Sequence, residues 1–231
     1  MGQRTTSDEP QLPAGDFSAW LRQMQGALRG EHDSEVPCGG CTACCTASQF
    51  IPIEADEVAT LARIPREVRF PAPRRPPGHV LLGYDERGHC PMLVDGACSI
   101  YEVRPRACRT YDCRVLPAAG VDLTERDKAL LAERARRWRF SHPTERDRAE
   151  HDAVRAAAAF LAERGDELPP GSVPASDTQR AVLAIEIHET FLHAEPADAD
   201  REAAGGRVAV VAPDPAAVRV AISRRVATPP P

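Results

Sequence analysis

Eight cysteines lie between residues 38 and 113 of this 231-residue chain, and none lies outside that segment. The segment has few long periodic stretches and many turn-forming residues, so it cannot bury enough apolar surface to hold a fold unaided. We therefore expect its thiols to cross-link it, through either metal centres or disulfides. The candidate metal ligands are Cys38, Cys41, Cys44, Cys45, Cys90, Cys98, Cys108 and Cys113.

The first cluster follows the pattern C-x2-C-x2-C-C from Cys38 to Cys45. Two residues between cysteines let a tight turn direct both sulfurs at one metal, and the two glycines after Cys38 permit that curl. Three thiols at this spacing are also typical of bacterial ferredoxins. Because Cys44 and Cys45 are adjacent and their side chains diverge, we do not expect both to bind one mononuclear ion. The pattern predicts two sites, or one site with a spare thiol.

The second cluster begins with the Cys90-Pro91 dipeptide, which is typical of the fourth ligand of a ferredoxin-type cluster. The first set is then Cys38, Cys41, Cys44 and Cys90, and the second is Cys45, Cys98, Cys108 and Cys113. Spacing alone does not enforce this grouping, and the second set could instead leave an open iron site. The expected cofactor is an iron–sulfur cluster of the 4Fe-4S type or Zn2+, in one or two centres.

Arginine is concentrated beside the second cluster, where four arginines lie within eleven positions. Arg104 and Arg109 stand in fixed relation to Pro105 and Cys108, so their guanidinium groups are candidates to offset the negative charge of a thiolate-bound cofactor. An ordinary solvated role explains these arginines equally well. A further basic stretch, residues 134–139, alternates with apolar positions, and we interpret it as a solvated helix face.

Charge and the N-terminal sequence restrict the partners and the compartment. With a net charge of −5 and a pI of about 5.8, the chain is not expected to bind nucleic acid or an anionic membrane surface. No apolar segment resembles a secretory signal or approaches the length of a membrane span. We therefore expect a cytoplasmic protein, in which metal binding is favoured over disulfides. Its expected partner is a metal ion or cluster, and a protein partner or protein substrate is left open.

Amphipathic spacing and capping residues predict that the rest of the chain is mostly helical. The expected helices cover residues 16–28, 54–63, 125–140, 145–164 and 177–194. Thr144 and Asp147 form a capping-box pattern, as do Thr124 and Asp127. Two β-hairpins are expected, one near residues 80–94 and one at the C-terminus, where 207–212 would pair with 217–226.

The predicted fold class is mainly α, with a loop-rich, metal-stabilised cysteine module and a small α+β character from the two hairpins. We divide the chain into a disordered lead (1–15), an N-terminal helix with the cysteine module (16–119), a helical region (120–195) and a linker, hairpin and proline-rich tail (196–231). No phosphate-binding glycine loop, dinucleotide fingerprint or G-x-S-x-G motif occurs, which argues against the common NTPase, Rossmann and hydrolase families.

The combined cysteine pattern resembles that of a known family. In order it comprises C-x2-C-x2-C-C, C-P-x-L, G-x-C-x-I-Y-x-x-R-P and C-R-x-x-x-C, and it covers Cys38 to Cys113, about a third of the chain. This order resembles the YkgJ family of cysteine-cluster proteins, whose CxxCxxCC domain is described as zinc- or iron-chelating. The resemblance implies a metal-chelating module, often described as an iron–sulfur oxidoreductase. The same domain is similar to the core of flagellin lysine N-methylases, which implies a protein-modifying enzyme.

The leading functional prediction is therefore an iron–sulfur protein with a redox or cofactor-dependent enzymatic role. The alternative is a zinc-stapled structural or interaction module without catalysis, since zinc held by four thiolates is closed and redox-silent. A protein lysine N-methylase-like enzyme is a further alternative, implied by the resemblance alone. No pattern in the sequence identifies a catalytic residue.

Overall fold

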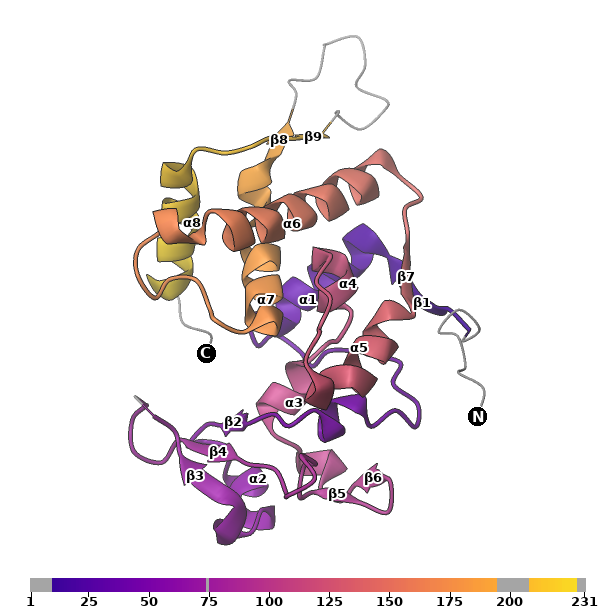
Figure 1. The fold of residues 1–231 in the computed structure, drawn as a ribbon, viewed down its shortest axis with the longest axis vertical. Coiled ribbons are helices and arrows are strands. Elements are labelled where there is room, and N and C mark those ends of the chain that lie inside the picture. The colour runs from indigo at the N-terminus through magenta and orange to yellow at the C-terminus, as the bar shows by residue number, and fades with distance from the viewer. Residues whose placement is uncertain (1–9, 74, 195–207, 228–231) are drawn as a thin grey trace. The chain divides into compact units, whose positions relative to one another are not determined.

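The computed structural model describes residues 10–73, 75–194 and 208–227 (Figure 1). These residues form helices and short strands, and the strands pair in four small sheets. The fold is therefore a mixed α+β type in which helices predominate. The chain divides into two compact units: unit 1 comprises Met1–Arg29, Arg114–Asp122 and Ala135–Pro231, and unit 2 comprises Gly30–Cys113 and Leu123–Arg134. In the described part of the chain, no helix has both the length and the apolarity needed to cross a membrane.

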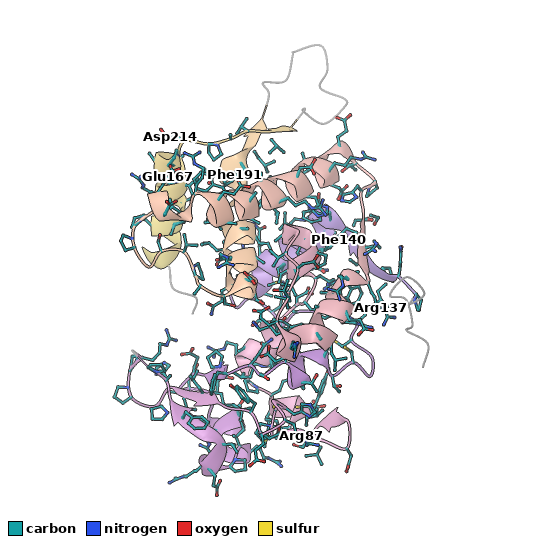
Figure 2. The ribbon with its side chains drawn as sticks, in the orientation of Figure 1. Arg87, Arg137, Phe140, Glu167, Phe191 and Asp214 are labelled. Carbon is teal, nitrogen blue, oxygen red and sulfur yellow. The ribbon has the colours of Figure 1, made fainter. Side chains whose placement is uncertain are left out.

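Unit 1 begins with a parallel strand pair that the sequence patterns did not predict. Strand β1 (Leu12–Asp16) runs beside β7 (Trp138–Ser141), and the amide of Leu12 donates to the carbonyl of Arg137 over 2.9 Å. The guanidinium of Arg137, labelled in Figure 2, also donates to the carbonyl of Pro10. The last residues of the segment expected to be a disordered lead therefore form a strand, which pairs with a strand far along the chain. Residues 1–9 of that lead lie outside the described residues.

Helices α1 (Phe17–Leu28) and α6 (Glu145–Glu163) share one capping carboxylate. The predicted capping box at α6 is confirmed: the amide of Asp147 donates to Oγ1 of Thr144 over 3.2 Å, and the amide of Thr144 donates to Oδ2 of Asp147 over 2.9 Å. The other oxygen of Asp147 accepts from the amide of Ser18 over 2.9 Å. Burial acts to raise the pKa of Asp147, but the hydrogen bonds from Thr144 and Ser18 outweigh it and lower the pKa to about 2.

The core of unit 1 is built around α6, which packs against α4 (Val115–Ala119) and α7 (Asp177–Ile187). The rings of Phe160 and Phe191 meet edge to face there, with their centroids 5.8 Å apart. Phe191, labelled in Figure 2, ends the 3-10 turn η6 (His188–Phe191). The other buried residues of this core are Ala153, Ala157, Leu161, Leu168, Leu183, Ala184, Ile187, Val218 and Ile222.

Two expected helices are shorter than their sequence patterns indicated. The segment 125–140 forms the 3-10 turn η4 (Arg126–Lys128) and helix α5 (Ala129–Arg136), and Trp138 is buried from strand β7 instead. The segment 177–194 leaves the α-helix after α7 and continues through η6 into strand β8 (Leu192–Ala194). In both places, pairing with a distant strand prevails over local helical spacing.

The expected C-terminal hairpin is wrong. Strand β9 (Val208–Val210) pairs antiparallel with β8, and the second half of the expected hairpin forms helix α8 (Pro215–Ala227). Proline suits the first turn of a helix, and the carboxylate of Asp214, labelled in Figure 2, accepts from the amide of Ala216 over 2.8 Å. Val218 and Ile222 then bury one helix face in the core of unit 1. The cap and this burial override the β-prone composition of the segment.

Unit 2 contains a three-stranded antiparallel sheet in the order β2-β4-β3. Its strands are β2 (Ile51–Ile53), β4 (Val80–Leu82) and β3 (Arg69–Pro71). Helix α2 (Val58–Arg63) replaces the longer helix expected from residue 54, and the 3-10 turn η2 (Arg66–Val68) leads into β3. Beside this sheet lies a small core cluster, made of Ile53, Ile64, Leu82, Met92 and Ile100. Leu123, Leu131 and Ala132 of the same unit are buried as well.

The expected hairpin of residues 80–84 with 90–94 is also wrong. Its turn forms, since the amide of Gly88 donates to the carbonyl of Asp85 over 2.9 Å, but β4 pairs with β2 and β3. A hairpin lies further along, where β5 (Leu93–Val94) pairs with β6 (Ala97–Cys98). The two residues between these strands have φ of +50° and +76°. An Asp-Gly dipeptide tolerates that left-handed pair, so the sequence did carry a signal for this turn.

Candidate metal centre

The first cysteine cluster is folded into consecutive tight turns. The amide of Cys41 donates to the carbonyl of Cys38 over 3.1 Å, and the amide of Cys45 donates to the carbonyl three residues earlier over 2.9 Å. Gly39 has φ of +57°, which glycine adopts at little cost. The 3-10 turn η1 (Ala43–Thr46) carries the last two cysteines. The backbone therefore curls as the C-x2-C-x2-C-C pattern predicted.

The second cluster is joined to the first by the backbone. The amide of Cys90 donates to the carbonyl of Cys45 over 2.7 Å. The β5–β6 hairpin places Cys98 opposite Leu93, and the side chains of Cys90 and Cys98 pack against the small core of unit 2. These two thiols are therefore positioned by apolar packing as well as by the backbone.

Cys108 lies in the middle of the short helix α3 (Arg106–Thr110). The first amide of this helix, that of Arg106, donates to Oε2 of Glu57 over 2.6 Å. The other oxygen of Glu57 accepts from the amide of Glu54 over 2.9 Å, and the residue is only 8% exposed. The helix that carries Cys108 is thus tied to the segment that precedes α2.

The thiols affect one another's ionisation, and Cys44 takes part in most of these interactions. A hydrogen bond with the side chain of Cys45 raises the pKa of Cys44 far above its usual range. Partial burial of the Cys44 thiol raises this pKa further. Burial, followed by the charges of Cys44, Cys90 and Cys98, raises the pKa of Cys108 to about 12. Burial also raises the pKa of Cys90, and Cys98 and Cys44 add to it. We call Cys44, Cys90, Cys98 and Cys108 the Cys44 group.

Cys38 and Cys41 are linked to the Cys44 group through Cys44. Burial raises the pKa of Cys38, and the charges of Cys44 and Cys41 raise it further. Spacing placed Cys90 with Cys38, Cys41 and Cys44, whereas in the structure Cys90 also interacts with Cys98 and Cys108. Thiols that spacing assigned to different sets therefore interact with one another. The assignment of individual ligands stays a prediction.

The donor chemistry of the segment suits zinc or iron. All eight cysteines are in the thiol form and outside any disulfide, and thiolates are the ligands that structural zinc and iron–sulfur sites use most. Within residues 10–73, 75–194 and 208–227, no three cysteine, histidine or carboxylate side chains converge closely enough to hold a metal ion.

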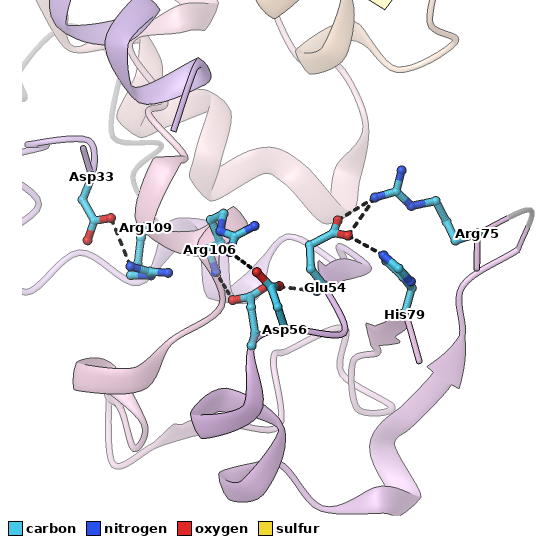
Figure 3. Close-up of polar contacts among 8 residues, drawn as sticks. Asp33, Glu54, Asp56, Arg75, His79, Arg106 and Arg109 are labelled. Atoms are coloured by element: carbon cyan, nitrogen blue, oxygen red, sulfur yellow. Dashed lines mark hydrogen bonds and ion pairs between the residues drawn. The ribbon is translucent and has the colours of Figure 1, made fainter. Parts of the chain in front are cut away.

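The two arginines predicted to lie near the centre have different neighbours. The positive charge of Arg104 opposes the rise in the pKa of Cys108, and its guanidinium lies 4.1 Å from the centroid of the Tyr101 ring. Arg109 forms an ion pair with Asp33 at 3.3 Å (Figure 3). Arg104 is thus the one of the two that acts on a candidate ligand.

Arg134 also approaches the first cluster, although its sequence context indicated a solvated helix face. Its guanidinium donates to the carbonyls of Pro37 and Cys38 over 3.2 and 3.4 Å. Its charge also opposes the rise in the pKa of Cys38. No local pattern distinguishes Arg134 from the arginines around it, because only tertiary packing brings α5 beside this loop.

Tyr111 is a second residue that the sequence patterns did not single out. Its hydroxyl oxygen is buried and has no hydrogen-bond partner among the described residues. Burial, followed by the charges of Cys113 and Cys44, raises the pKa of this hydroxyl. The side chain of Gln49 acts in the opposite direction. The only sequence signal for Tyr111 is its place inside the C-R-x-x-x-C motif.

A comparison with known families bears directly on this segment. Residues 37–136 match the family described as "CxxCxxCC: Putative zinc- or iron-chelating domain". The match supports the resemblance of this segment to the cysteine-cluster family. This cysteine-cluster segment contains all eight cysteines together with Tyr111 and Arg134, and it spans less than half of the chain. The match therefore supports metal binding by residues 37–136. No curated protein and no solved structure matched the chain.

Proposed function

We propose that the cysteine-cluster segment binds a metal centre through the Cys44 group, and that this centre is an iron–sulfur cluster with a redox role. The observation that carries the proposal is the hydrogen bond from the amide of Cys90 to the carbonyl of Cys45, 2.7 Å long, which joins the two cysteine clusters. The effects of Cys44, Cys90 and Cys98 on the pKa of Cys108 agree with it. Four thiolates are the usual ligand set of a 4Fe-4S cluster. When bound, such a cluster supplies one-electron transfer.

The charge environment of the thiols supports a cluster. The segment has eight cysteines, enough for two centres with four thiolates each. Arg104 and Arg134 bring positive charge to Cys108 and Cys38, respectively. Such charges stabilise thiolates and offset the net negative charge of a four-thiolate centre. Free thiols in this number also persist best in a reducing compartment, so we propose a cytoplasmic location.

A structural zinc site is the second candidate, and the small core of unit 2 favours it. Five buried apolar side chains form that core, and Cys90 and Cys98 pack against it. Zinc binding contributes directly to the folding free energy of such modules. In this version the segment is redox-silent and acts through its surface.

Anaerobic purification of the full-length chain separates these candidates. Iron, zinc and acid-labile sulfide are assayed per chain, and the visible spectrum is recorded. The proposal expects brown protein with about four irons and four sulfides for each centre. Colourless protein with stoichiometric zinc and no sulfide would replace the cluster by a structural zinc site, and a chain that retains neither metal would refute both.

A pair of variants tests the central place of Cys44. Cys44→Ser removes the thiol that interacts with the other members of the group, so iron and sulfide content should fall by at least half. Thr42→Ser is the matched control in the same turn and should retain the wild-type content. Equal metal content in the two variants would contradict the assignment of Cys44.

A further inference from the structure

Three exposed aromatic side chains lie together on the three-stranded sheet of unit 2. Ile53 and Leu82 of this sheet belong to the small core cluster, whereas Phe50, Phe70 and Tyr84 are 52%, 47% and 41% exposed. The ring centroids of Phe50 and Phe70 lie 6.1 Å apart, and those of Phe50 and Tyr84 lie 5.0 Å apart. We call Phe50, Phe70 and Tyr84 the aromatic platform.

Gly83 allows the ring of Phe70 to lie close against the backbone of the sheet. A Cβ atom added to Gly83 would come within 2.5 Å of Cε2 of Phe70, so any other residue would displace this ring. Single exposed apolar side chains are common on protein surfaces, but a group of them in mutual contact marks a candidate binding site. The platform therefore needs a partner that covers aromatic rings.

The size of the platform restricts this partner. A buried aromatic side chain covers about 150–250 Å², so three that are about half exposed offer about 300 Å². A stable interface between two folded proteins buries about 800 Å² on each side. The platform is therefore too small to hold a second copy of the chain, and its size suits a short peptide segment.

A peptide is not expected to join this sheet as a fourth strand. Both edge strands contain a proline, Pro52 in β2 and Pro71 in β3. Proline has no amide hydrogen to donate, and prolines in edge strands oppose pairing with a further strand. A peptide would therefore bind through contacts with the rings and not by strand addition.

The charges of the segment that carries the platform are balanced. Residues 48–90 contain six arginines and six carboxylates. Arg75 forms an ion pair with Glu54 at 2.7 Å (Figure 3), and Arg87 forms one with Asp85 at 3.1 Å. Single-stranded nucleic acid also stacks on aromatic rings, but it requires a positively charged surface for its phosphates. Balanced charge therefore favours an uncharged peptide.

We propose that the aromatic platform binds a proline-rich segment of another protein in the polyproline II conformation. Such segments dock on surfaces lined by aromatic side chains. The polyproline II helix advances about 3.1 Å per residue, so two residues along it match the ring spacings of 5.0 and 6.1 Å. Its carbonyls have no internal hydrogen bonds, and the Tyr84 hydroxyl is a donor for one of them. Because this helix is ordered before binding, it loses little entropy on a small surface.

Fluorescence anisotropy of a labelled decaproline peptide, titrated with the full-length chain, tests this proposal. We expect saturable binding with a Kd below about 1 mM. Phe50→Ala removes the ring that contacts both others, so it should weaken binding at least about tenfold. Leu130→Ala is the matched control, because Leu130 is 57% exposed and lies outside the platform. Its Kd should stay within about twofold of the wild type, as expected for a residue outside the interface.

The peptide proposal is overturned if the wild-type chain does not bind decaproline, or if Phe50→Ala leaves the Kd unchanged. Two further measurements address the other partners. If decathymidylate binds more tightly than decaproline and Phe50→Ala weakens it, the platform is a nucleic-acid surface. If the wild-type chain forms a dimer that Phe50→Ala abolishes, the platform is a self-association surface. Either result would replace the peptide as the occupant.

A second variant keeps the proposal testable if circular dichroism shows that Phe50→Ala fails to fold. Gly83→Ala retains all three rings, but its new Cβ atom forces the Phe70 ring to move. The affinity for decaproline should then fall by about fivefold. An unchanged affinity in folded Gly83→Ala would show that the arrangement of the rings does not matter and would refute the proposal.

Discussion

Glu57 links two parts of the cysteine-cluster segment through its two carboxylate oxygens, so Glu57→Gln should destabilise this segment. One oxygen accepts from the amide of Glu54 over 2.9 Å and the other from the amide of Arg106 over 2.6 Å. A glutamine has one oxygen, and its NH2 group would face the second amide, donor against donor. Hydrogen bonds to a charged group contribute about 1.5–3 kcal/mol each. We therefore expect the free energy of unfolding to fall by about 2 kcal/mol.

Urea unfolding of the metal-loaded full-length chain, followed by circular dichroism, measures this loss. Glu67→Gln is the matched control, because Glu67 is exposed and the same change there should fall within about 0.5 kcal/mol of the wild type. Since Arg106 begins the helix that carries Cys108, Glu57→Gln should also release bound metal to a chelator faster than the control does. Equal unfolding free energies for the two variants would refute the proposed role of Glu57.

Three further predictions concern single side chains. Asp147 has a pKa of about 2 in the folded protein and about 3.8 in the unfolded chain. Above pH 4 its ionised form should therefore add about 2 kcal/mol to the free energy of unfolding. That contribution should disappear as pH falls towards 2, and Asp147→Asn should flatten the acid limb of a stability–pH curve; an unaltered limb would contradict this. Arg134→Gln should accelerate metal loss to a chelator relative to Arg136→Gln, and equal rates would remove Arg134 from the site. Leu82→Ala should cost about 2–5 kcal/mol in thermal unfolding, whereas the same change at the exposed Leu130 should cost far less.

The parts of the fold that were predictable from the sequence are those stabilised by neighbours along the chain. The capping box at Thr144 needs only residues three positions apart, and the apolar stripe of α1 follows from helical spacing. The curl of the first cysteine cluster likewise depends on local turns and glycine. Each of these patterns forms by itself within one or two turns of backbone, so spacing was sufficient evidence.

The wrong predictions concern segments whose secondary structure depends on contacts with residues far along the chain. Strand β4 was expected to pair across the turn that follows it, but β2 and β3 flank it on both edges, and its residue Leu82 is buried. The segment of α8 has β-prone residues, yet Asp214 caps it as a helix and unit 1 buries its face. In each case the free energy of long-range burial exceeds the small local preference.

By itself, the sequence determined that this chain depends on its thiols, because eight cysteines at turn spacing in a segment with little apolar content leave few other ways to stabilise it. Only the tertiary structure decided which thiols interact and which other groups approach them. Cys44 interacts with Cys90 and Cys108, and Arg134 and Tyr111 reach the same segment. Electrostatic interactions between thiols, and the burial of a hydroxyl, depend on distance in space, which spacing along the chain does not encode.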